Sequence, residues 1–141
     1  MADLDLKYIA GLFDGEGCIH IDKHEKPCLH YSLVVHLTNS NAKVIKKVRK
    51  TIGFGCIQTE RKTKKIVYIF RLCSRQAKSF LVKVYPYLEI KKEQTKLAIE
   101  YQSKKPKRGQ KTFDKSLQLK YRERINSFNS TKGKRSLKQV G

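Results

Sequence analysis

The sequence predicts an α+β domain in which a four-stranded antiparallel sheet carries helices on one face, in the order αββαββα. Two pairs of segments with period-two alternation, within 18–37 and 55–72, indicate two β-hairpins, and helical patterns precede, separate and follow them. The length of 141 residues suits a single hydrophobic core. We expect one domain over residues 1–129, with its core at about 6–103, a last helix at about 114–129 and a basic, flexible tail over 130–141.

The charge balance indicates a polyanionic partner. The chain has 32 lysines and arginines against 12 aspartates and glutamates, a formal net charge of +20. Nucleic acid is the expected partner, and a membrane is not, because no apolar run reaches membrane-spanning length and no basic amphipathic helix stands alone. The four cysteines are scattered, with no Cys-x-x-Cys pair for zinc, which predicts a reduced, intracellular compartment.

The first expected helix has two different faces. Leu6, Ile9 and Phe13 recur at helical spacing and form an apolar face. Ala10 and Gly11 have almost no side chain, so a second helix can approach the backbone there.

Two acids end this helix. Asp14 and Glu16 alternate with Gly15 and Gly17, and glycine permits the left-handed dihedral angles that stop a helix. Carboxylates at this negative end of the helix dipole are unfavourable unless a cation, such as a metal ion, compensates them. The alternative is a pair of solvated acids beside a glycine cap.

The first hairpin alternates between apolar and polar residues. Residues 18–24 and 29–37 form its strands, and Lys26-Pro27 makes the turn. Its outward positions are His20, Asp22, His24, His30, Ser32, Val34 and His36.

The second half repeats the pattern. Asn39-Ser40-Asn41 offers capping residues for a helix over 42–52, and strands at 55–60 and 66–72 flank a basic turn at 61–65. The outward positions of this hairpin include Gln58, Glu60, Lys65 and Arg71. Further helices are expected from 74 to 85, ended by Pro86, and up to about 103, followed by a basic loop over 104–109.

The outward face of the sheet favours duplex DNA. A two-stranded ribbon fits the major groove, where hydrogen-bonding side chains reach base edges. Tyr31, Tyr68 and Phe70 have the parity of the core, so stacking platforms for single-stranded RNA are missing from this face. For any one of these polar residues, a solvated sheet face is the alternative interpretation.

Residues 9–17, with the sequence IAGLFDGEG, resemble the defining motif of the LAGLIDADG homing endonucleases. The expected order of elements is similar to that family's fold over about residues 6–103. The resemblance implies a site-specific endonuclease that cuts double-stranded DNA by metal-dependent hydrolysis at a long, near-palindromic target. It also implies a homodimer formed through the motif helix, with Mg²⁺ or another divalent cation such as Mn²⁺ as cofactor.

The resemblance also assigns roles to single residues. It implies that Glu16 and the backbone carbonyl of Gly15 bind the metal, and that Ala10, Gly11 and Asp14 belong to the dimer interface. In the family, the acid at the position of Asp14 supports the helix end more than it binds metal.

Two positions match the family outside the motif, and a third is a weaker candidate. Lys91, in the segment Leu88-x-x-Lys91-x-x-Gln94, is implied to lie beside the scissile phosphate, unless it is a solvated lysine at a helix start. Asn39 is implied to position water, or else it caps the following helix. Lys43 is a weaker candidate for a phosphate contact.

Two other functional classes stay open at this stage. One is a non-catalytic nucleic-acid binder on the same fold, an intron maturase or a transcriptional regulator, with RNA as partner only for a maturase. The other is a basic ribosome-associated protein, which explains the charge but not the glycine-flanked acids.

Overall fold

The computed structural model describes residues 3–25, 30–105 and 114–140. Its elements follow the expected order, with a short 3₁₀ turn after the third helix. They are α1 (Asp3–Glu16), β1 (Gly17–His24), β2 (His30–Asn39), α2 (Ala42–Ile52), β3 (Cys56–Lys62), β4 (Lys65–Cys73), α3 (Ser74–Val84), η1 (Tyr85–Tyr87), α4 (Lys92–Lys104) and α5 (Lys115–Val140).

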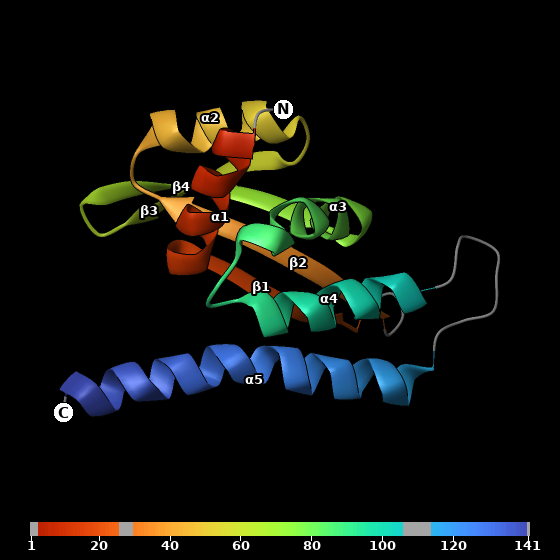
Figure 1. The fold of residues 1–141 in the computed structure, drawn as a ribbon. Helices are drawn as coiled ribbons and strands as arrows, with labels where there is room; N and C mark the ends of the chain where they lie inside the picture. The colour runs from red at the N-terminus through yellow and green to blue at the C-terminus, as the bar shows by residue number, and fades with distance from the viewer. Residues whose placement is uncertain (1–2, 26–29, 106–113, 141) are drawn as a thin grey trace.

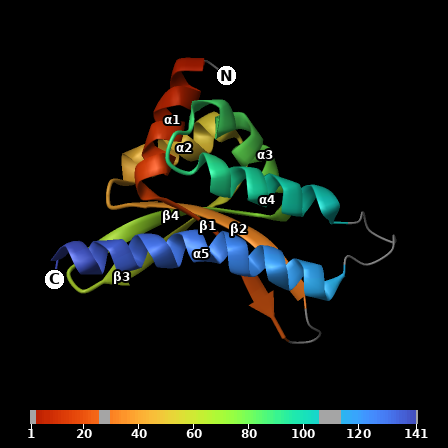
Figure 2. The same cartoon turned by 60° about the horizontal axis from the view of Figure 1, so that its bottom comes forward.

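The four strands form one antiparallel sheet in the order β1-β2-β4-β3. Helices α1 to α4 lie over one face of this sheet (Figures 1 and 2). The predicted α+β fold with a four-stranded antiparallel sheet is therefore confirmed. No helix in the described part of the chain is long and apolar enough to span a membrane.

The core lies between the sheet and the helices, as the alternation predicts. The inward residues of the first hairpin that the structure describes, among them Ile19, Ile21, Leu33 and Leu37, are buried. Val34 is an exception to the expected polar face, because it has outward parity and is nevertheless buried. It lies on an inner strand, opposite His20 of β1 and Cys73 of β4, so neighbouring side chains cover it from both sides.

Two element ends differ from the expected ones. The basic turn of the second hairpin is shorter than 61–65, because the strands continue to Lys62 and from Lys65 and leave a two-residue turn with Thr63 at φ 51°. Helix α5 continues to Val140 instead of ending at 129, since residues 130–140 contain one glycine, Gly133, and no proline. The Lys26-Pro27 turn and residues 106–109 of the basic loop lie outside the described residues.

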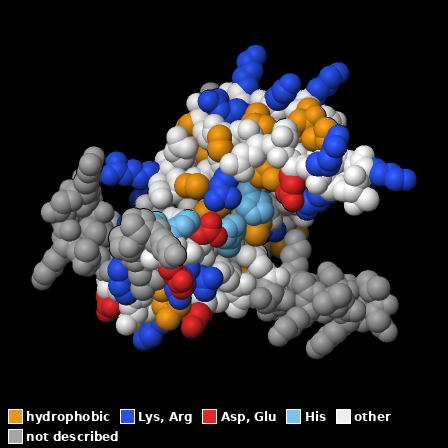
Figure 3. All heavy atoms as spheres, turned by 180° about the vertical axis from the view of Figure 1, so that it is seen from behind, with side chains coloured by type: hydrophobic (Ala, Val, Ile, Leu, Met, Phe, Trp, Pro, Cys, Tyr) orange, Lys and Arg blue, Asp and Glu red, His pale blue; other side chains and the backbone are white. Residues whose placement is uncertain are grey.

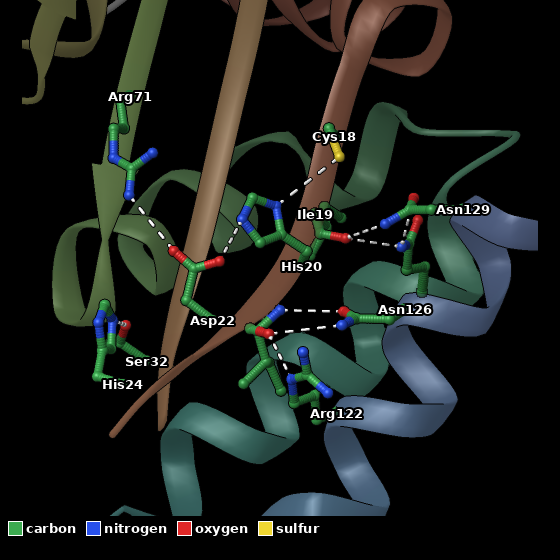
Figure 4. Close-up of polar contacts among 12 residues, drawn as sticks. Cys18, Ile19, His20, Asp22, His24, Ser32, Arg71, Arg122, Asn126 and Asn129 are labelled. Atoms are coloured by element: carbon green, nitrogen blue, oxygen red, sulfur yellow. Dashed lines mark hydrogen bonds and ion pairs between the residues drawn. The ribbon is translucent and has the colours of Figure 1, made fainter. Parts of the chain in front are cut away.

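Helix α5 lies along the edge of the sheet, beside β1, and not over the helix-covered face (Figure 2). The side-chain amide of Asn126 accepts from Ile21 N at 3.1 Å and donates to Ile21 O at 3.4 Å, as a neighbouring strand would. Asn129 donates to Ile19 O at 2.9 Å, and Gln94 of α4 donates to the same oxygen at 3.0 Å (Figure 4). These amides satisfy backbone groups that an edge strand otherwise leaves open to another chain.

Candidate functional site

The C-terminal end of α1 passes directly into β1. A Cβ atom on Gly17 would lie 2.0 Å from Cδ1 of the Phe13 ring, so only glycine fits at this junction. The expected left-handed glycine is absent here, since the described glycines with positive φ are Gly53 and Gly55. Glycine therefore serves close packing at this helix end, and the buried Phe13 ring fixes where the last turn of α1 lies.

Asp14 anchors this turn to the segment that precedes α4. Its side chain is buried, and its two carboxylate oxygens accept from Glu89 N at 2.7 Å and Lys91 N at 2.9 Å. Both oxygens are thus bound to backbone of the same chain. Its expected support of the helix end agrees with these contacts, whereas its expected place in a dimer interface stays a prediction.

Lys91 also contacts the last turn of α1. It is 5% exposed, and its Nζ donates to the carbonyl oxygen of Asp14 at 3.0 Å. Lys91 is also the residue that precedes α4, so its backbone and its side chain both bind the end of α1. The alternative of a solvated helix-start lysine is wrong, because burial and these contacts hold the ammonium group at a carbonyl two residues from Glu16 along the chain.

Glu16 is exposed at the end of α1 and meets a residue from the end of β2. Asn39 Nδ2 donates to Glu16 Oε2 at 2.7 Å, and Asn39 Oδ1 accepts from Asn41 N at 2.8 Å. The cap of α2 is Asn41, whose side chain accepts from the N–H groups of residues 43 and 44. Asn41 and not Asn39 therefore caps α2, which leaves the contact with Glu16 as the role of Asn39.

The exposed end of α1 offers oxygen ligands. The Glu16 carboxylate and the exposed Gly15 backbone are the donor type that Mg²⁺ or Mn²⁺ prefers, so the residues present fit such an ion. In the described parts of the chain, no group of three or more metal-binding side chains includes Glu16. One chain therefore brings a single carboxylate to this place.

The face of α1 that points away from the core has small residues and few contacts with the rest of the chain. Ideal Cβ atoms built on Gly11 and Gly15, one turn apart, meet nothing within 4 Å, and Tyr8 beside them is 51% exposed. Ala10 is fully buried in the chain's own core, and its expected contact with a partner stays a prediction. The helix surface open to another molecule passes through Tyr8, Gly11 and Gly15.

The uncovered face of the sheet carries the predicted polar residues. The strand register puts His20 and Asp22 of β1, His36 of β2 and Arg71 of β4 on the same face. The histidines gather in the middle of this face (Figure 3). Further out on β3 and β4, Gln58, Glu60 and Lys65 are exposed, and so is Lys43 at the start of α2.

Several of these side chains bind one another. Asp22 is the centre of the network, 2.8 Å from His20 Nε2 and 3.5 Å from Arg71 Nη2 (Figure 4). Nearer the hairpin turn, a ring nitrogen of His24 lies 3.0 Å from Ser32 Oγ, and the His24 ring stacks on His30. The face is thus a connected polar surface and not a set of independent solvated side chains.

His36 lies in the least solvated part of this network. Burial, together with the electrostatic influence of His20 and Arg71, lowers the pKa of His36 below its usual value. Its neutral imidazole is therefore favoured.

Sequence reasoning missed two features of this region. One is Cys18, whose outward parity follows from its two-residue spacing to His20. The other is the set of side-chain amides that cover the edge of β1.

The comparisons with known proteins agree with this fold. The family model described as LAGLIDADG endonuclease matches residues 9–105. Among solved structures, the homing endonuclease I-TnaI is similar over 99% of this chain and 100% of its own, with a TM-score of 0.68 and 21% identity. The archaeal intron-encoded homing endonuclease I-Vdi141I, complexed with DNA, is similar over 88% of this chain and 98% of its own, with a TM-score of 0.59 and 17% identity.

A third similar structure is the homing endonuclease I-CvuI, in complex with an I-CreI target in the presence of Mg. It covers 72% of this chain and 67% of its own, with a TM-score of 0.63 and 21% identity. No curated protein sequence matches the chain. The match of the family model covers more than half of the chain and includes the motif helix, both hairpins and Lys91, so the protein belongs to the LAGLIDADG endonuclease family.

Proposed function

We propose that the protein is a site-specific DNA endonuclease of the homing type, which hydrolyses phosphodiester bonds with a divalent metal ion. One observation carries the proposal. The Glu16 carboxylate is exposed at the end of α1, while the backbone that presents it is held by the buried contacts of Asp14 and Lys91. A solvated acid needs no such support, whereas a catalytic ligand depends on fixed geometry.

Each residue of this site has a distinct role. Glu16 and the Gly15 carbonyl would hold the metal ion, which would supply charge neutralisation and an activated water. Asn39, 2.7 Å from Glu16 Oε2, fixes the orientation of the carboxylate and offers its amide to that water. Lys91 brings a positive charge to the last turn of α1, where it stabilises negative charge that develops on the phosphate.

The active form is a homodimer, because each strand of a duplex needs its own cleavage centre and each chain carries one motif helix. Two copies of α1 pack through the bare surface at Gly11 and Gly15, where the backbones can come close. A two-fold axis between these helices brings two copies of Glu16 to one centre. The same symmetry makes the DNA target a near-palindrome.

The sheet supplies recognition. Its uncovered face is polar, and the charge of +20 attracts the phosphate backbone. A curved antiparallel sheet places its strands along the major groove, where His30, Gln58 and Lys65 can reach bases or phosphates. The DNA complexes of I-CvuI and I-Vdi141I support duplex DNA as the substrate class.

A cleavage selection from a random library tests the activity and finds the target sequence at the same time. The wild type and Glu16→Gln are incubated with Mg²⁺ and a plasmid library that carries randomised palindromes, and the linearised molecules are sequenced. The wild type is expected to enrich one family of sites, and Glu16→Gln is expected to bind those sites without cutting them. Glu123→Gln removes an equally exposed charge on α5 and serves as the matched control.

Two outcomes contradict the proposal. If Glu16→Gln cuts as fast as the wild type, the catalytic assignment of Glu16 is wrong. If the wild type binds the library DNA but linearises none of it in Mg²⁺ or Mn²⁺, the chain is a DNA-binding protein and not a nuclease.

A further inference from the structure

A second group of potential metal ligands lies on the uncovered face of the sheet, apart from Glu16. Cys18 and His36 are direct cross-strand partners on β1 and β2, and His20 is two residues beyond Cys18 on the same face. One ligand atom from each of the three lies within 4.8 Å of the others. In the described part of the chain, these three residues are the one such group.

The distances are close to those of a tetrahedral site. Zn–S bonds of about 2.3 Å and Zn–N bonds of about 2.0–2.1 Å put sulfur and nitrogen roughly 3.6 Å apart at a tetrahedral angle. Cys18 Sγ and His20 Nδ1 are 3.9 Å apart, and the rings of His20 and His36 meet with centroids at 5.4 Å and planes inclined by 68°. For both atoms to bind one ion, the sulfur and the nitrogen must therefore move a few tenths of an ångström closer together.

Asp22 orients the nearest imidazole toward the group. It lies 2.8 Å from His20 Nε2, which leaves Nδ1 facing Cys18 (Figure 4). A histidine that donates its outer N–H to a carboxylate while its other nitrogen binds the ion is the usual arrangement in zinc proteins. Arg71, 3.5 Å from the other Asp22 oxygen, holds that carboxylate in place.

His36 supplies an independent observation. Its Nδ1 is buried and has no hydrogen-bond partner in the described structure. A buried polar atom without a partner costs free energy, and a nitrogen in this position is expected to bind either water or an ion.

We propose that Cys18, His20 and His36 form a zinc site that ties β1 to β2 in the middle of the DNA-facing sheet. One thiolate and two imidazoles suit Zn²⁺ and not Mg²⁺, which prefers oxygen. The three ligands leave a fourth position for water on the solvent side. His20 and His36 then act as ligands and not as readers of DNA bases.

Cobalt spectroscopy tests the site without DNA and without cleavage, so the result does not depend on the proposed nuclease activity. Untagged, reduced full-length protein is titrated with Co²⁺, and thiolate-to-cobalt charge-transfer and tetrahedral d–d absorption are measured. Wild-type protein is expected to bind one equivalent, and Zn²⁺ is expected to displace it. Zn²⁺ is also expected to raise the melting temperature of the wild type.

The variants separate this site from other thiols. Cys18→Ser is expected to lose the charge-transfer band, and His36→Gln is expected to lose the tetrahedral spectrum. Both variants are expected to lose the thermal shift. Asp22→Asn is expected to weaken binding by about ten- to a hundredfold. Cys56→Ser and Cys73→Ser change exposed cysteines on the same sheet and are expected to bind like the wild type. Circular dichroism verifies that each variant is folded.

The proposal is overturned by any of three results. These are a wild type without stoichiometric cobalt binding, a Cys18→Ser variant that keeps the thiolate band, or a folded His36→Gln variant that binds Zn²⁺ as tightly as the wild type. Asp22→Asn keeps the three ligands and the side-chain shape, so it tests the site even if another variant fails to fold.

Discussion

The end of α1 and the uncovered face of the sheet are both polar, yet they are held in different ways. At the end of α1, Asp14 and Lys91 are buried and bind backbone groups, and Glu16 is the charged side chain that is exposed. On the sheet, Asp22 and His20 bind other side chains at the surface. The first region is a fixed scaffold around one carboxylate, and the second is a network of partly exposed groups.

This difference predicts how each region responds to substitution. A change in the scaffold moves Glu16 or leaves a buried group without its partner, so its effect on cleavage is large. A change on the sheet removes one contact among many, so its effect is on DNA affinity and is small. The ligand types differ as well, since the first region offers oxygen and the second offers nitrogen and sulfur.

The largest effect is expected from Gly11→Leu. The new side chain has open space in the single chain, and leucine raises helix propensity by up to about 1 kcal/mol, so the monomer stays folded. In the proposed dimer, the same bulk separates the two α1 helices and displaces both copies of Glu16. Dimerisation and cleavage are therefore expected to be lost together, as measured by sedimentation at micromolar concentration and by plasmid linearisation.

A matched control for Gly11→Leu is Ser79→Leu, which adds similar bulk at an exposed position of α3. It is expected to leave the dimer and the cleavage rate unchanged. A wild type that sediments as a single chain, both free and on its DNA site, contradicts the homodimer and the two-centre mechanism that rests on it.

The next effect is that of Lys91→Met, which nearly keeps the length of the side chain and removes its charge. Cleavage is expected to slow by about two to four decades, as for one electrostatic or acid–base catalytic group. Burial adds a second consequence, because the Asp14 carbonyl loses its donor, and the free energy of unfolding is expected to fall by about 1–3 kcal/mol.

Lys92→Met is the control for this change, since Lys92 is the exposed neighbour in sequence and lies over the Tyr85 ring. It is expected to alter neither quantity by much. A Lys91→Met enzyme that loses stability but cuts saturating DNA at the wild-type single-turnover rate would make Lys91 a purely structural lysine.

The sequence predicts the fold well because its patterns are local. Strand parity follows from alternation alone, and the ends of α2 follow from Asn41 and Gly53. Contacts distant in sequence are not predictable in this way. Periodicity does not say that Gln94 and Asn129 meet at the Ile19 carbonyl, nor that Ala10 faces the core, because both depend on how α4, α5 and α1 pack.

Asn39 and Asn41 test the scaffold with a smaller effect. Asn39→Ala removes the donor to Glu16 and is expected to slow cleavage by about ten- to a hundredfold, the range for residues that orient a metal ligand. Asn41→Ala removes the cap of α2 and is expected to cost about 1 kcal/mol of stability without changing cleavage. Single-turnover kinetics and urea unfolding distinguish the two, and equal kinetics for both variants would leave Asn39 with no part in catalysis.

The smallest effect is expected on the sheet, from Lys65→Ala. Lys65 is exposed at the start of β4, opposite Lys62, where two positive charges face each other across the strands. In the unbound protein this pair is mildly repulsive, so removing one charge leaves stability unchanged or slightly higher.

On DNA, a lysine that neutralises one phosphate contributes about one unit to the slope of log K against log salt. Lys65→Ala is thus expected to reduce that slope by about one, with the cleavage rate at saturation unchanged, while Lys83→Ala on the helix side changes neither. An unchanged slope for Lys65→Ala would remove the tip of the second hairpin from the DNA interface.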